Sequence, residues 1–114
     1  MNLQQIIEKM DLTLLTQKKD FSEITPSQGY ASDLLSCVMS GAPHGSLWVT
    51  LQAHTNIVAV AALLELSAII ISEGAMPDEN TIKKANEEDI TLLSSGLSTF
   101  SIISKLSALG IEGK

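Results

Sequence analysis

The sequence predicts an α/β fold in which a mostly parallel sheet, wholly parallel or mixed, of about four to six strands is flanked by helices. From residue 47 onward, apolar strand-like segments alternate with helical segments, which is the pattern of βαβ units. The segment 68–71 is apolar at every position, as expected for a strand that helices cover on both faces of the sheet. A length of 114 residues fits one domain, so we expect residues 1–114 to form a single unit.

The chain opens with a predicted amphipathic helix. Asn2 is a good N-cap, Gln5 stands three residues later as in a capping box, and apolar residues follow at helical spacing. The segment 12–16 then has the pattern of a strand, and 21–24 that of a second strand after a polar turn. We therefore expect one or two strands before the alternating pattern begins.

Proline and glycine mark the next boundaries. The segment 25–29 is a predicted loop, because Pro and Gly interrupt regular structure and the residue before Pro avoids the α region. Ser32 or Asp33 is expected to cap a helix that Gly41 ends. Cys37 lies in this helix, and as a small free thiol we expect it to be buried.

Three strand and helix pairs complete the chain, and successive parallel strands joined by helices imply right-handed crossovers. The predicted strands are 47–51, 68–71 and 90–93, and the predicted helices are 56–66, 78–87 and 99–109.

Composition and charge exclude several classes of function. The formal net charge is −6, and all seven basic residues are lysines. Nucleic-acid binding is disfavoured, because an acidic chain without arginine lacks both the basic face and the bidentate base-reading side chain. An anionic ligand would have to be held by backbone N–H groups and lysine.

The sequence also indicates a cytoplasmic protein that does not enter the membrane. One cysteine excludes an internal disulfide and a paired-cysteine metal site. The first residues lack a basic region followed by an apolar stretch, so no signal peptide is expected. The longest apolar run, 57–71, is interrupted by Glu65 and Ser67 and is too short for a membrane span.

No metal, cofactor or catalytic motif is evident. Metal-ligating side chains in predicted loops do not form a recognisable pair, so we expect no metal site. The phosphate loop, the dinucleotide-binding fingerprint and the nucleophile elbow are all missing, which disfavours kinase, dehydrogenase and hydrolase chemistry. We therefore expect neither a bound cofactor nor an autonomous enzyme.

Polar side chains gather where predicted strands end, and ligands of open α/β sheets bind at that carboxyl edge. The segment after the strand 47–51 is the richest in such groups and opens directly into a helix, whose N–H groups favour an anion. Our first candidates for ligand binding are Gln52, His54 and Asn56. The second set of candidates comprises Thr50, Asp33, Ser94 and Ser95.

Each candidate also has a structural interpretation. His54, near a helix N-terminus, is expected to be neutral, and it either contacts a ligand or bonds the loop backbone. Asn56 is expected in an N-cap or first-turn role, with ligand contact as the alternative. Ser94 and Ser95, followed by Gly96, either offer hydroxyl and N–H groups to an anion or cap the next helix.

Two segments, 28–39 and 47–61, resemble the DRTGG domain family, and the similarity extends over nearly the whole chain. The region aligned with the family's motif is 25–29, which keeps only the final glycine, Gly29. The resemblance implies a fold similar to the amino-terminal domain of HPr kinase/phosphorylase. It also implies a regulatory rather than catalytic role, since such domains occur alone or beside phosphotransacetylase domains and CBS pairs.

The leading hypothesis is a homodimeric regulatory or sensor module that binds a small anionic metabolite or nucleotide at the carboxyl edge. A second hypothesis is a homodimeric scaffold that docks a partner protein or itself, using the apolar face of the helix 99–109. A third is an accessory subunit of a partner enzyme, with His54 as general base assisted by Asp33.

Overall fold

Five strands form one mixed, mostly parallel sheet in this computed structural model, which describes residues 1–114. Their order across the sheet is β1-β5-β4-β3-β2. Four strands run parallel, namely β2 (Gly29–Ala31), β3 (Leu47–Thr50), β4 (Ala68–Ile71) and β5 (Leu92–Ser94). The short β1 (Thr13–Leu14) pairs antiparallel with β5 at one edge. The predicted α/β fold class is therefore confirmed, in its mixed form.

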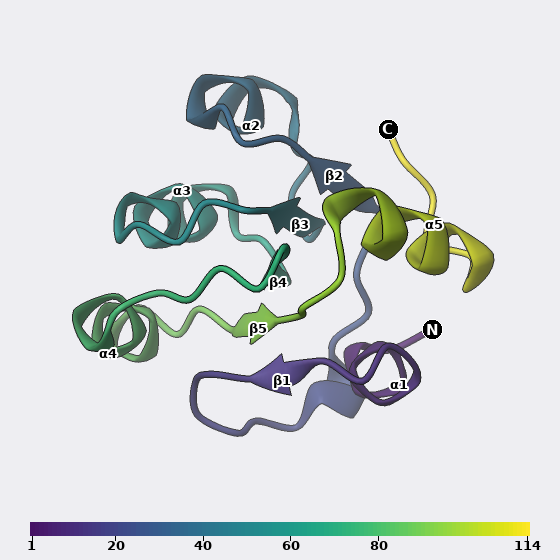
Figure 1. Ribbon diagram of the computed structural model, residues 1–114, viewed down its shortest axis with the longest axis horizontal. Helices are drawn as coiled ribbons and strands as arrows, with labels where there is room; N and C mark the ends of the chain where they lie inside the picture. The colour runs from purple at the N-terminus through teal and green to yellow at the C-terminus, as the bar shows by residue number, and fades with distance from the viewer.

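The helices form one layer on each side of the sheet (Figure 1). The connecting helices α2 (Leu35–Gly41), α3 (Asn56–Leu64) and α4 (Glu79–Glu87) cover one face. The terminal helices α1 (Leu3–Lys9) and α5 (Thr99–Ala108) cover the other. This arrangement is a three-layer α/β/α sandwich, in which both faces of the central strands are buried.

Alternate strand residues enter two separate apolar cores. Trp48, Ile69 and Leu92 join the core under α2, α3 and α4. Val49 and Ile70 join the core under α1 and α5. Side chains on a strand alternate between faces, so a strand covered on both sides must be apolar at every position. This geometry explains the uninterrupted apolar sequence of β4.

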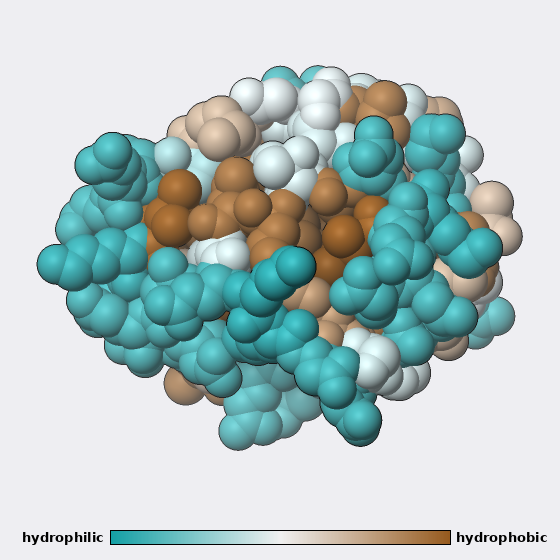
Figure 2. Space-filling model, turned by 90° about the horizontal axis from the view of Figure 1, so that it is seen from below, coloured by the Kyte–Doolittle hydropathy of each residue, from teal (hydrophilic) through white to brown (hydrophobic).

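Apolar surface also reaches the β1 edge of the sheet. Figure 2 views the molecule from this edge and shows apolar side chains at the centre of the face, surrounded by hydrophilic ones. Leu14 and Leu15 are half-buried there, and they pack against opposite cores. The two-residue strand β1 thus closes the end of both cores.

The amino-terminal helix has the predicted cap. Asn2 Oδ1 accepts the Gln5 N–H at 2.9 Å, and Gln5 Oε1 accepts the Asn2 N–H at 2.9 Å. The predicted strand 21–24 is wrong, because Phe21–Glu23 forms the 3₁₀ helix η1. Asp20 caps this turn by accepting the Ser22 N–H, and Phe21 is buried beneath α1.

Helix α2 differs from expectation at two points. Neither Ser32 nor Asp33 caps it, since the N-cap residue is Leu34, which provides no side-chain hydrogen bond. Cys37 is exposed rather than buried, because the neighbouring Val38 takes the core position on this helix.

Other boundaries move by one or two residues. Helix α3 ends at Leu64, earlier than the predicted residue 66, because Glu65 adopts a left-handed conformation with φ of 53°. Strand β5 begins at Leu92 rather than at Ile90. None of the helices is both long enough and apolar enough to cross a membrane.

Candidate functional site

The carboxyl ends of β2, β3, β4 and β5 meet at one edge of the sheet, because the four strands are parallel and adjacent. This edge carries the seven side chains predicted to bind a ligand. They fall into three groups along it, one at the ends of β2 and β3, one at the start of α3, and one after β5. The groups differ in how many of their polar atoms lack a hydrogen-bond partner within the protein, and we call such atoms open.

The first group is a connected hydrogen-bond network. Thr50 Oγ1 donates to Asp33 Oδ1 at 2.7 Å, and the Leu51 N–H donates to the same oxygen at 2.9 Å. Gln52 Nε2 donates to the Asp33 carbonyl at 3.2 Å, and the Gln52 N–H donates to Thr50 Oγ1 at 3.1 Å. The structure thus brings together three of the candidates, and their contacts fix the loop that follows β3.

The second group lies at the start of α3. His54 is exposed, and its Nδ1 accepts the Asn56 N–H at 3.2 Å. A neutral imidazole that accepts at Nδ1 carries its proton on Nε2, so Nε2–H is the open donor. Asn56 is the first residue of α3 and is exposed, whereas Thr55 holds the N-cap position.

Asp33 and His54 do not form a catalytic pair. No hydrogen bond joins them: Asp33 Oδ1 accepts from Thr50 Oγ1 and the Leu51 N–H, and His54 Nδ1 accepts from the Asn56 N–H. Asp78, the N-cap of α4, is the carboxylate on which a protonated His54 would act. The pKa of Asp78 is lowered chiefly by hydrogen bonds from Thr81, and desolvation opposes this effect.

The loops that follow β4 and β5 hold each other in place. The Glu73 N–H donates to the Leu97 carbonyl at 2.8 Å, and the Gly74 N–H donates to the Ser95 carbonyl at 3.0 Å. In return, the Thr99 N–H donates to Glu73 Oε2 at 2.8 Å. These bonds fix the approach to α5 and position the third group.

Ser94 and Ser95 do not cap α5. That role belongs to Ser98, whose Oγ accepts the Ser101 N–H at 3.1 Å. Ser95 Oγ accepts the Leu97 N–H at 3.1 Å and so shapes the loop. Ser94 is only 8 % exposed, and its hydroxyl has no protein partner.

A polar cavity of about 450 Å³ adjoins this third group, between the end of α1 and α5. Lys9 and Lys105 line it, and neither forms a salt bridge. Asp11 is the one acidic residue in the lining, which therefore has a formal charge of +1. The remaining lining residues are Met10, Thr13, Ser94, Ser95, Gly96 and Leu97.

The two lysines were missed by the sequence analysis, although lysine was expected to hold any anion. Lys9 lies at the end of the first helix and Lys105 near the end of the last. Their proximity depends on the pairing of β1 with β5, which brings the end of α1 and the start of β1 to the carboxyl edge. No spacing along the sequence carries that information.

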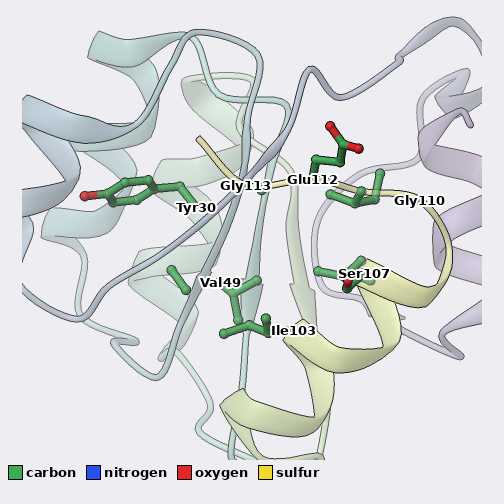
Figure 3. Close-up of a pocket in the computed structure, with 11 residues that line it drawn as sticks. Tyr30, Val49, Ile103, Ser107, Gly110, Glu112 and Gly113 are labelled. Atoms are coloured by element: carbon green, nitrogen blue, oxygen red, sulfur yellow. The ribbon is translucent and has the colours of Figure 1, made fainter.

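A second, more apolar cavity of about 530 Å³ lies between β2, α5 and the residues that follow α5 (Figure 3). Val49 and Leu106 are buried in its lining, and Ile103 stands half-exposed beside them. We call it the β2–α5 groove. Its full lining is Gly29, Tyr30, Ala31, Val49, Ile103, Leu106, Ser107, Gly110, Ile111, Glu112 and Gly113.

Gly29, the glycine retained from the family motif, has a packing role in this groove. A Cβ atom on Gly29 would lie 3.3 Å from Ile111 Cγ2, which is tighter than nine in ten such contacts. The Gly29 N–H also donates to the Glu112 carbonyl at 2.9 Å. The missing side chain therefore lets the segment after α5 lie against β2.

The fold and its edge define the class of protein: an α/β/α sandwich with polar groups and a basic cavity at the carboxyl ends of its strands. A solved structure of similar fold is the CBS and DRTGG domain region of a Clostridium perfringens pyrophosphatase, complexed with its activator, diadenosine tetraphosphate. The TM-score is 0.75 at 16% sequence identity, and the match covers 97% of this chain and 47% of that chain. This likeness supports a DRTGG-like fold.

The chain thus spans about half of the chain it matches. Comparison with models of protein families and with curated proteins gave no match. No group of three or more His, Cys, Asp or Glu side chains is arranged to hold a metal ion.

Proposed function

We propose that this protein is a non-catalytic regulatory module that binds a small anionic metabolite or nucleotide at the carboxyl edge of its sheet. The observation that carries the proposal is the polar cavity beside β5. It holds two lysines without acidic partners in a chain whose net charge is −6. Unpaired lysines in a concave site attract an anion, because the site concentrates their field.

The other groups at the edge would add orientation to this attraction. The Gly96 N–H donates to no protein acceptor, and the Ser94 hydroxyl has no protein partner. Farther along the edge, His54 Nε2–H is an open donor, while Gln52 and Asn56 flank it. A ligand with an anionic end and a polar body could contact both parts of the edge.

The solved structure of similar fold supports a nucleotide as the first ligand to test. It is a regulatory region bound to a nucleotide activator. On this view the present chain senses a phosphorylated metabolite and passes its binding state to a partner enzyme, as a cytoplasmic homodimer.

The test is native mass spectrometry of the gently purified protein, followed by a thermal-shift panel of nucleotides and sugar phosphates. We expect a retained or stabilising anion whose affinity falls at least tenfold in Lys9→Met/Lys105→Met and falls also in His54→Ala and Gln52→Ala. The matched control is Lys18→Met, since Lys18 is exposed and lies outside the cavity. A protein that neither retains nor responds to any of these anions would contradict the proposal.

A second candidate function is docking to another copy or to a partner protein. The observation that favours it is the apolar surface at the start of α5, where Phe100 is 83% exposed and Ile103 is 42% exposed. The rest of the predicted docking face belongs to the core, because Ile102 and Leu106 are buried against the sheet and Leu109 packs partly buried beside them. The test is light scattering. If this face forms a dimer interface, the unmodified protein should be a dimer and Phe100→Ser should be a monomer.

A further inference from the structure

The β2–α5 groove is separate from the carboxyl-edge site and has a different chemistry. Ile103 and Ser107 line it from one face of α5, whereas Lys105 points to a different face and lines the polar cavity. The groove lining contains no basic side chain, and its one charged residue is Glu112. Figure 3 shows the Glu112 carboxylate directed away from Val49 and Ile103, so the floor is apolar.

The wall formed by β2 is an open strand edge. The Leu47 N–H donates to the Gln28 carbonyl, so Gln28 and Tyr30 direct their backbone groups toward β3. By the same alternation, Gly29 and Ala31 direct theirs outward, away from the sheet. Of these outward groups, only the Gly29 N–H is bonded to the segment after α5, since it donates to the Glu112 carbonyl. The Gly29 carbonyl and the Ala31 N–H are thus an acceptor and a donor, side by side, at the groove.

These features restrict the ligand. An anion is disfavoured, since no cation lines the groove and Glu112 stands at its rim. A purely aliphatic ligand would cover the outward backbone groups of β2 without replacing their hydrogen bonds to water. A volume of about 530 Å³ lies within the range of small-molecule sites.

We propose that the β2–α5 groove binds a neutral, flat heteroaromatic ring of the nucleobase class. The ring stacks on the apolar floor formed by Val49, Ile103 and Leu106. Its edge, with a donor beside an acceptor, pairs with the Gly29 carbonyl and the Ala31 N–H. This site acts independently of anion binding at the carboxyl edge.

The experiment is an NMR titration of the ¹⁵N-labelled protein with adenosine, guanosine, cytidine and uridine. These probes carry a base but no phosphate. We expect at least one of them to shift the amide signals of Ala31, Ile103 and Gly110. Naphthalene-1-methanol, which is flat but has no ring nitrogen, should bind at least tenfold more weakly.

Two variants of α5 test the groove, one at a residue that lines it and one at a residue outside the lining. Ser107→Phe fills the groove from an exposed position of α5 and should weaken binding at least tenfold. Ser104→Phe, on the same helix but outside the lining, should leave affinity within twofold of wild type. Ile103→Ala removes part of the apolar floor and should also weaken binding. This variant tests the proposal even if Ser107→Phe does not fold.

Three outcomes would overturn the proposal. The first is that none of the four nucleosides shifts any groove signal. The second is that their shifts map to residues 52–56 or 94–97, which would assign the base to the carboxyl edge. The third is that Ser107→Phe, folded by circular dichroism, binds as well as Ser104→Phe.

Discussion

The polar atoms of the carboxyl edge divide into those bonded within the protein and those left open to a ligand. Asp33 Oδ1 accepts two hydrogen bonds, so this carboxylate acts chiefly to hold the loop after β3. His54 uses Nδ1 for the Asn56 N–H and keeps Nε2 free. At this scale the open groups are few, and the charged ones that line the polar cavity are Lys9, Lys105 and Asp11, of which two are cationic.

Asp78 makes stability depend on pH. Hydrogen bonds from Thr81 hold the pKa of Asp78 below its usual value of 3.8. Because the folded pKa is the lower one, the carboxylate stabilises the fold above that value, and this stabilisation disappears as the pH falls through the folded pKa. We expect Asp78→Ala to lower Tm at about pH 7, with the deficit narrowing toward about pH 2.

The measurement is Tm by circular dichroism across this pH range. Glu87→Gln is the control, because Glu87 is an exposed acid at the opposite end of α4. An Asp78→Ala deficit that stays constant from neutral to acid pH would show that the carboxylate charge has no part in the cap.

Among the elements, β4 is the central strand of the sheet, and it contributes residues to both cores. It lies between β3 and β5, and all four of its residues are buried. Helices α2, α3 and α4 pack on one side of it and α1 and α5 on the other. By contrast, β1 and β2 are short edge strands, and their surfaces form parts of the two cavities.

We therefore expect Ile70→Ala in β4 to lower the free energy of unfolding by about 2–5 kcal/mol, since it leaves a cavity where the side chain is fully buried. Leu63→Ala on α3 removes a similar number of carbon atoms from a side chain that is 65% exposed, and it should change the same quantity by less than about 0.5 kcal/mol. Urea unfolding of both variants checks this. Equal losses would contradict the assignment of β4 to the core.

Over the whole molecule, the two ends of the chain are built into the same sheet sandwich. The amino-terminal β1 pairs with the late strand β5, α5 packs on β3, and the segment after α5 accepts a hydrogen bond from β2 at the Glu112 carbonyl. No early or late part of the chain can therefore separate without exposing a core. This connectivity favours one cooperative unit.

We expect residues 1–114 to unfold in a single two-state transition. Trp48 is the only tryptophan and is fully buried, so its fluorescence reports the core under α2, α3 and α4. Far-UV circular dichroism reports the helices of both layers. The two urea curves should coincide, whereas separate midpoints would show two units instead of one domain.

The sequence by itself determined the class of fold, the strands β3 and β4, and most of the helices. These features are local, because caps such as Asn2 and apolar periodicity act over a few residues. The same local reasoning failed at residues 21–24, where burial of Phe21 and the Asp20 cap outweigh a strand-like composition. The carboxyl edge was also predictable, since parallel strands bring their carboxyl ends together.

Only the tertiary structure decided the order of the strands, the partners of the polar side chains, and both cavities. Lys9 and Lys105 are 96 positions apart (105 − 9), and they meet because β1 lies beside β5. The β2–α5 groove likewise joins Gly29 to Ile111, where a Cβ atom on residue 29 would lie 3.3 Å from Ile111 Cγ2. Such contacts arise from packing between distant segments, and a single sequence specifies them only through the complete fold.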